Sequence, residues 1–184
     1  MLVKYHIKSF TLIELILVIA IISLLTGAII PVINSAIEDT RVSMIMNTYH
    51  TIKVACENFY SDTGLYPFED PRFNWLWLSQ DPGVVNGWDG PYINRPINSK
   101  DNPYGGDVFV NHGVFGFGIG GNFVYLEFDN IPIRIAKKVD KLLDNKVEAN
   151  WRYKGRVQYF GIEPNAFLYF FIIGDGYYYT VVNQ

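Results

Sequence analysis

The sequence has little cysteine, little histidine and little charge. Of its 184 residues one is cysteine, three are histidine and 18% are charged, whereas 49% are hydrophobic and 16% are aromatic. A single cysteine cannot form an intrachain disulfide, so a disulfide-stapled scaffold is excluded. The composition also excludes a disordered chain and a coiled-coil rod, since each requires a different balance of residues. What remains is a globular protein of about one domain with an appendage.

Patterns typical of catalysis, metal binding or cofactor binding are equally scarce. His6, His50 and His112 are scattered and match neither the H-x-x-x-H nor the H-E-x-x-H spacing. Residues 116–121 (GFGIGG) fit G-x-G-x-x-G, but residues 123–128 after them have the pattern of a strand, where a dinucleotide site needs a helix. No pair of carboxylates lies in a context that indicates acid–base catalysis. We therefore expect no enzyme and no bound cofactor.

The excess of hydrophobic residues is concentrated near the N-terminus. Residues 10–30 contain a single charge, Glu14, and no proline. A helix of this length measures about 30 Å, enough to cross the hydrocarbon core of a bilayer. Lys4 and Lys8 precede it, and the positive-inside rule places them in the cytoplasm and the rest of the chain outside. A cleaved secretory signal is the alternative, but such signals have a shorter apolar run and a stronger cleavage site than Thr26-Gly27-Ala28.

Glu14 is the anomaly in this apolar run. A carboxylate inside an apolar helix costs on the order of 2.5–3.5 kcal/mol on insertion scales, so it is a functional candidate with a cationic partner to be found. The alternative is that Glu14 lies near the membrane interface and extends its carboxylate to water. If the chain were cut between Ser9 and Phe10, the new α-amino group would lie one helical turn from Glu14. The terminus of one copy could then neutralise Glu14 of a neighbour when identical helices stack.

Residues 9–15 (SFTLIEL), between a short basic leader and a long apolar run, resemble the processing site of type IV prepilins and of the pseudopilins of type II secretion. The resemblance implies cleavage of the Ser9–Phe10 bond by a prepilin peptidase, N-methylation of Phe10 and a role for Glu14 in filament assembly. It also implies a helix kink at Pro31. The family usually has glycine before the cut, where this chain has Ser9, which leaves the efficiency of processing open.

Beyond Pro31 the helical pattern continues to about Ser61 as an amphipathic helix, with Gly64 as its stop. Apolar residues at steps of three and four predict one stripe that packs on a globular head: Val42, Ile45, Tyr49, Ile52, Cys56 and Phe59. Within this stripe Cys56 is interpreted as a small hydrophobic residue rather than a reactive thiol.

The remaining chain has the pattern of strands and one helix. The predicted strands are Val108–Val110, Phe123–Phe128, Val157–Phe160, Phe167–Ile173 and Tyr177–Val182. Asp175-Gly176 predicts a hairpin between the last two. Asn130-Ile131-Pro132 predicts a helix start, and Ile135, Val139, Leu142 and Leu143 predict its apolar face through Asp144. The fold class is therefore α+β, a type IV pilin-like fold in which a long N-terminal helix packs on an antiparallel β-sheet head.

Three blocks of the head, residues 60–67, 88–93 and 101–105, resemble the major pseudopilin of type II secretion, although each could also be an ordinary Gly/Pro turn with an aromatic anchor. Many type IV pilins close a C-terminal loop with two cysteines, which this chain cannot do. The resemblance also implies calcium near the C-terminus, at Gly174-Asp175-Gly176, but no acidic residue follows, so the sequence does not support a calcium site. The missing calcium ligands favour a pilus. The three blocks of the head and the lack of a cysteine pair favour a pseudopilus.

We expect a leader at residues 1–9, a transmembrane and filament-core helix at residues 10–30, and a head at residues 31–184 that includes the amphipathic half of the helix. The expected function is that of a structural subunit, most like a pseudopilin of type II secretion, with a type IV pilin for adhesion, motility or DNA uptake as the alternative. The resemblance implies a bacterial inner-membrane protein with a cytoplasmic N-terminus and an extracytoplasmic head, assembled into a periplasmic or extracellular filament. The implied partners are further copies, prepilin peptidase, the inner-membrane assembly platform and minor pilins or pseudopilins.

Two alternatives concern the head. In the first, the helix is only an anchor, and an aromatic surface with Trp75, Trp77 and Trp88 recognises sugar or peptide. In the second, the basic segment 134–156 binds DNA, whereas the other interpretations of this segment are a solvated helix face or a surface that faces the acidic stretch 57–129 of the next subunit in a filament. This second alternative is the weaker one because the protein as a whole is acidic, and we do not expect a nucleic-acid partner.

Overall fold

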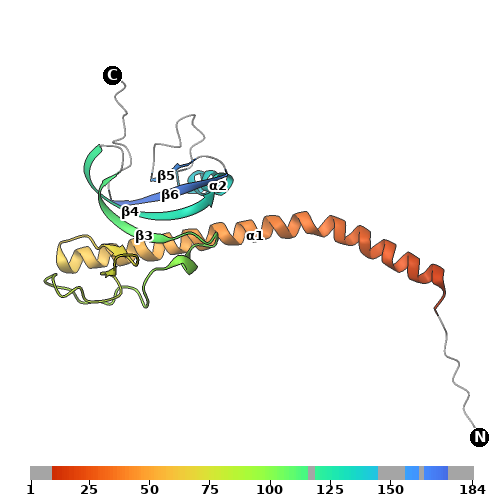
Figure 1. The fold of residues 1–184 in the computed structure, drawn as a ribbon, viewed down its shortest axis with the longest axis horizontal. Coiled ribbons are helices and arrows are strands. Elements are labelled where there is room, and N and C mark those ends of the chain that lie inside the picture. The colour runs from red at the N-terminus through yellow and green to blue at the C-terminus, as the bar shows by residue number, and fades with distance from the viewer. Residues whose placement is uncertain (1–9, 116–118, 145–155, 162–163, 174–184) are drawn as a thin grey trace, which may run out of the picture. The chain divides into compact units, whose positions relative to one another are not determined.

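A computed structural model describes residues 10–115, 119–144, 156–161 and 164–173. The chain divides into two compact units, Met1–Thr40 and Arg41–Gln184. One helix, α1 (Leu12–Thr63), contributes to both units, and the head in the second unit adds a sheet and a shorter helix (Figure 1). The predicted α+β class, with a long N-terminal helix and an antiparallel sheet, is confirmed.

The helix α1 has the start and stop signals of a regular helix. It begins directly after Thr11 and ends at Thr63, where Gly64 has φ +70° and its N–H donates to the carbonyl of Tyr60 at 2.8 Å. Glycine is the residue that adopts this left-handed conformation without steric cost. The predicted stop at Gly64 is therefore confirmed.

The head contains a six-stranded antiparallel sheet in the order β2-β1-β3-β4-β6-β5. Its strands are β1 (Glu69–Asp70), β2 (Trp75–Leu76), β3 (Val108–Phe115), β4 (Ile119–Pro132), β5 (Val157–Phe160) and β6 (Asn165–Ile173). The four longer strands correspond to predicted strands. The two-residue strands β1 and β2 are too short to give a periodic signal and were not predicted. The predicted hairpin at Asp175-Gly176 and the strand Tyr177–Val182 lie outside the described residues.

The core lies between the second part of α1 and one face of the sheet. All six residues of the predicted stripe are buried, and Ala55 is buried with them. Opposite them, alternate strand residues point inward, as a half-buried sheet requires: Val108, Val110, Leu126, Phe128, Leu168 and Phe170. The rings of Tyr49 and Phe170 stack with their centroids 4.8 Å apart, which joins the helix to β6. The free thiol of Cys56 is buried in this core, as its interpretation as a small hydrophobic residue requires.

The second helix begins later than predicted. Residues Asn130, Ile131 and Pro132 end β4, where Ile131 pairs with Ala166 of β6, and α2 spans Ile133–Asp144. Asn130 has φ +57°, which is incompatible with a helical start.

The prediction that Leu142 belongs to the buried apolar face of α2 is also wrong, since Leu142 is 60% exposed. The buried arc of α2 is centred between Val139 and Asp140, and Leu142 falls at its edge, whereas Leu143 packs against the core.

The glycine-rich segment belongs to the sheet. Gly120 and Gly121 are the second and third residues of β4, so a strand rather than a helix follows the G-x-G-x-x-G pattern, as expected. A strand at this position cannot present a helix N-terminus to a pyrophosphate group.

The connection between β2 and β3 is held against the C-terminal end of α1 by polar contacts. The Tyr92 hydroxyl donates to Asp62 Oδ2 at 2.9 Å and accepts from the Asp89 N–H at 3.1 Å. Gly87 has φ +85°, and a Cβ at this position would overlap the carbonyl oxygen of Asp62. The chain therefore requires glycine at residue 87 for both conformation and space.

Replacing Gly87 by alanine is expected to destabilise the head more than Gly105→Ala does. Gly105 has φ +79° and open space around its Cβ, so its substitution costs only the left-handed strain of roughly 1–2 kcal/mol. Gly87→Ala adds an overlap with backbone that cannot move freely. Denaturant unfolding of the full chain in detergent micelles measures both losses, and equal losses would show that the contact with Asp62 is unimportant.

Candidate functional site

The first turn of α1 is closed by a capping box between Thr11 and Glu14. The backbone N–H and the hydroxyl of Thr11 both donate to Glu14 Oε2, each at 2.8 Å, and Thr11 Oγ1 accepts from the Glu14 N–H at 3.3 Å. These reciprocal bonds provide acceptors for backbone N–H groups at the start of the helix, which have no carbonyl partner within the helix. The spacing T-x-x-E is a sequence signature of this motif that the sequence interpretation of Glu14 overlooked.

The capping box fixes where the Glu14 carboxylate lies relative to the expected cleavage site. Phe10 is 83% exposed directly before Thr11, and Ser9 lies outside the described residues. Both capping bonds are accepted by Oε2, so Oε1 can accept a further hydrogen bond from outside the chain. A negative charge in the first turn is also favoured by the helix dipole. The carboxylate is therefore oriented before any partner arrives.

The first part of α1 presents apolar side chains on all sides. It includes a stretch with mean hydropathy 2.9, long and apolar enough to cross a membrane, of which none is buried within the protein. Its polar hydroxyls bond internally, since Ser23 Oγ donates to the Ile19 carbonyl at 2.7 Å and Thr26 Oγ1 to the Ile22 carbonyl at 2.8 Å. A surface of this kind is stable only in lipid or against other apolar helices.

Pro31 lies inside α1, and the helix continues through it. Proline has no N–H, so the carbonyl of Gly27 loses its helical partner at this point, and the proline ring crowds the same carbonyl. A glycine at residue 27, with open space around it, lets the backbone adjust there. A kink at Pro31 stays a prediction.

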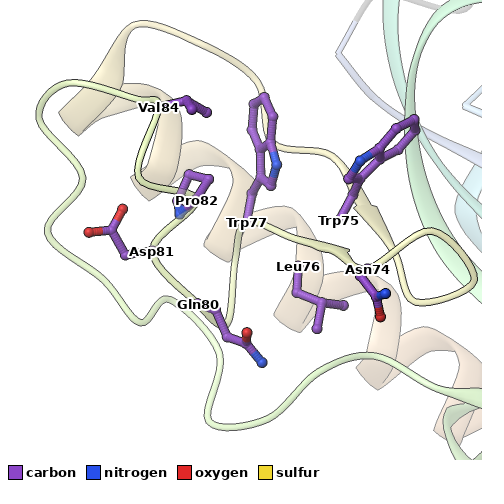
Figure 2. Close-up of a pocket in the computed structure, with 8 residues that line it drawn as sticks. All are labelled: Asn74, Trp75, Leu76, Trp77, Gln80, Asp81, Pro82 and Val84. Carbon is purple, nitrogen blue, oxygen red and sulfur yellow. The ribbon is translucent and has the colours of Figure 1, made fainter.

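The head carries an open cleft between β2 and the loop that follows it (Figure 2). The cleft has a volume of about 390 Å³ and is lined by Asn74, Trp75, Leu76, Trp77, Gln80, Asp81, Pro82 and Val84. Figure 2 shows Trp75 and Trp77 on one side of the strand segment, with Asn74 and Leu76 on the other. Pro82 and Val84 lie on the loop across from Trp77.

The two tryptophans of the cleft are held by other aromatic rings. Trp77 stacks on Phe59 of α1 at 6.2 Å, and its carbonyl accepts from Trp88 Nε1 at 2.9 Å. Trp75 meets the ring of Phe68 edge-on at 4.5 Å and remains 48% exposed. Of the three tryptophans singled out in the sequence, two therefore line the cleft and Trp88 supports it from outside. No periodic signal pointed to Asn74, Gln80 or Asp81, because a loop brings them to the cleft.

Glu69 anchors the loop behind the cleft. Its side chain is fully buried, and Oε1 accepts hydrogen bonds from the N–H groups of Leu78 and Ser79, the second at 3.3 Å. Burial raises the pKa of Glu69 to about 7, although the two N–H donors oppose this shift. Burial likewise raises the pKa of Glu127 and that of Asp140 to about 7, with Asp129 and Asp144 as the respective neighbouring charges.

Exposed charged residues are found both in the basic segment 134–156 and in the acidic stretch 57–129. On α2, Arg134, Lys137 and Lys141 are exposed. Part of the acidic charge is internal to the head, as in the 3.1 Å ion pair between Asp70 and Arg72. Among the described residues, no three histidine, cysteine or carboxylate side chains gather as a metal site. Residues 174–176, where the resemblance implied calcium, lie outside the described part of the chain.

Comparison with known proteins gives three findings. Residues 5–30 match the family model of the prokaryotic N-terminal methylation motif, and residues 36–113 match that of the C-terminal part of PilW. The fimbrial protein EcpC of Eikenella corrodens is 30% identical over 92 residues, which are 50% of this chain and 54% of that protein. The chain thus spans about half the length of this curated relative. No solved structure matches.

The fold and the N-terminal motif together define a type IV pilin-like subunit. The two matched segments and the fimbrial relative are consistent with the type IV prepilin and pseudopilin family, whose members are structural subunits.

The raised pKa of Glu69 predicts how the stability of the head depends on pH. The folded state binds the proton of Glu69 more tightly than the unfolded chain, whose value is 4.5, so stability falls as pH rises from 4.5 to about 7. Glu69→Gln keeps an acceptor for Leu78 and Ser79 without a charge. We expect this variant to match the parent near pH 4.5 and to be more stable above about pH 7.

Thermal unfolding of the full chain across this pH range, followed by near-ultraviolet circular dichroism, measures the effect. Glu57→Gln is the matched control, because it removes an exposed carboxylate whose ion pair with Lys53 is long, at 3.7 Å. The Glu69→Gln curve should be shallower but not flat, since Glu127 and Asp140 remain. Parallel curves for parent and Glu69→Gln would contradict the assignment.

Proposed function

We propose that the chain is cleaved between Ser9 and Phe10, methylated at Phe10 and polymerised through α1 into a type IV pilus-like filament. The observation that carries this proposal is an oriented carboxylate, Glu14, placed one turn from Phe10 at the start of a helix whose apolar side chains are exposed on all sides. Prepilin peptidase, an inner-membrane assembly platform and minor pilins or pseudopilins are the partners that this function requires. Before assembly, α1 anchors the subunit in the inner membrane with its N-terminus in the cytoplasm.

Cleavage changes the chemistry at Phe10. The bond to Ser9 is an uncharged amide, whereas the new N-terminus is an amine that carries a positive charge near neutral pH. A carboxylate and an amine that enter an apolar filament core are each costly alone and much less costly as a pair. Oε1 of Glu14 is the atom available to accept from the amine of a neighbouring subunit. Pairing of this kind sets the register between adjacent helices.

For the type of filament, we propose a type IV pilus fibre. The relative EcpC is a fimbrial protein, and no acidic residue follows Asp175 to complete the calcium site that the pseudopilin resemblance implies. The pseudopilus of type II secretion is the second candidate, favoured by the three blocks of the head and by the lack of a second cysteine. In the structure, however, these blocks make local turns and anchors, such as the Gly64 helix stop and the Tyr92–Asp62 contact, so they discriminate weakly.

Two substitutions separate the charge of Glu14 from its capping role. Glu14→Gln keeps an oxygen that can accept from Thr11 but removes the charge, so we expect filament formation to be lost. Thr11→Ala removes the hydroxyl contacts of the capping box, at a cost of about 1 kcal/mol to the helix, and keeps the backbone N–H of residue 11 and the charge of Glu14, so we expect filaments to form.

Electron microscopy of filaments sheared from the surface of cells that express each variant measures the outcome, with the chain detected in the membrane as a control for expression. Filament formation by Glu14→Gln would overturn the charge-pairing role. Loss of filaments in Thr11→Ala alone would assign Glu14 to helix capping instead.

A further inference from the structure

We propose that the cleft between β2 and the following loop binds a neutral saccharide with an all-equatorial pyranose ring, such as a β-linked glucose or N-acetylglucosamine unit. The proposal goes beyond filament assembly, because none of the residues that line the cleft belongs to the first unit of the chain. It rests on the shape of the cleft, its aromatic surface, its polar groups and its charge.

The exposed indole of Trp75 is a preformed stacking surface. Phe68 and Phe73 contact it with ring centroids 4.5 Å and 5.4 Å away, so the ring is positioned without a ligand. The negative π-face of an indole attracts weakly positive C–H groups. An all-equatorial pyranose has such C–H groups on both faces and no axial hydroxyl that would hold the rings apart. Trp75 therefore suits a flat sugar better than an irregular apolar group.

Polar residues that line the cleft together with the tryptophans match the hydroxyl groups of a sugar. The amides of Asn74 and Gln80 can each donate and accept, and Asp81 adds a carboxylate. Asp81 Oδ1 accepts from the Gly83 N–H at 2.8 Å, which orients the carboxylate and leaves Oδ2 able to accept from a hydroxyl. A volume of about 390 Å³ lies within the usual range of small-molecule sites, about 300–1,000 Å³.

The charge of the cleft selects against anions. Asp81 is the single ionisable residue among the eight that line the cleft, and no lysine, arginine or histidine is among them. A phosphate, a nucleotide or a sialylated glycan would meet an acidic site with no cation to neutralise it. The same surface accepts neutral hydroxyl groups without this penalty. A neutral saccharide is therefore favoured over an anionic one.

The test is saturation-transfer-difference NMR on the full chain in a zwitterionic detergent without sugar headgroups. The probes are cellotetraose and chitotetraose, with 3′-sialyllactose as the anionic comparison. We expect saturable transfer to one or both neutral tetrasaccharides, strongest at the axial C–H protons of one ring face, and none to sialyllactose. Absence of transfer to both neutral probes would overturn the proposal, as would equal transfer to sialyllactose.

Variants assign the signal to the cleft. Trp75→Ala should weaken binding about tenfold, equivalent to about 1.4 kcal/mol, and Gln80→Ala, an exposed polar change that leaves the aromatic rings intact, should weaken it severalfold. The matched control is Phe167→Ala, which removes an aromatic side chain that is 45% exposed outside the cleft and should leave binding unchanged. Equal weakening by Phe167→Ala, or no effect of Gln80→Ala and Trp75→Ala in folded protein, would contradict the assignment.

The same measurement on sheared filaments tests whether the cleft stays open after assembly. Binding that is present in micelles but absent in filaments would show that a neighbouring subunit covers the cleft, and would overturn sugar binding by the assembled filament.

Discussion

The structure depends on the burial of one stripe of α1 beneath the sheet. Val42, Ile45 and Phe59 are almost fully buried, and Tyr49 of the same stripe stacks on Phe170 of β6, so this stripe gives the head its core. The loops, the Glu69 anchor and the tryptophan cleft are all attached to this core, for example through the stacking of Trp77 on Phe59. In the first part of the same helix, the apolar stretch is not buried by any of the residues that the structure describes. One continuous helix thus provides both the scaffold of the subunit and an apolar surface that must be covered in a membrane or by other helices.

The proposed function gives the carboxylate at the start of α1 two purposes. Glu14 closes the capping box with Thr11, which accounts for an acidic residue in the first turn of an otherwise apolar helix. The same contacts hold the charge beside the position where processing would create an amine. Capping and pairing are compatible because a carboxylate has two oxygens. Pre-orientation of this kind lowers the entropy that would be lost when a neighbouring helix docks.

Periodicity in the sequence was sufficient to predict the long helix, its buried stripe and the four longer strands, because each depends on a pattern repeated over several residues. The helix stop at Gly64 was predicted from the residue type alone, because glycine adopts the left-handed conformation that ends a helix. Three features could not be predicted in this way. The two-residue strands β1 and β2 have no periodicity, and the start of α2 depended on the positive φ of Asn130. The cleft depended on the conformation of the loop that follows β2, which no periodic pattern specifies although the lining residues are close in the sequence. The capping box, by contrast, could have been predicted from the T-x-x-E spacing of Thr11 and Glu14.

In the proposed function, processing at Phe10 converts a membrane-anchored chain into a filament subunit. Mass spectrometry of the N-terminus of the chain isolated from a membrane that contains prepilin peptidase tests this conversion. We expect a mature chain that begins at Phe10 and carries one methyl group on its α-amine. A chain that retains residues 1–9 in both membrane and filament fractions would contradict it, and would favour a membrane-anchored binding module whose function lies in the head alone.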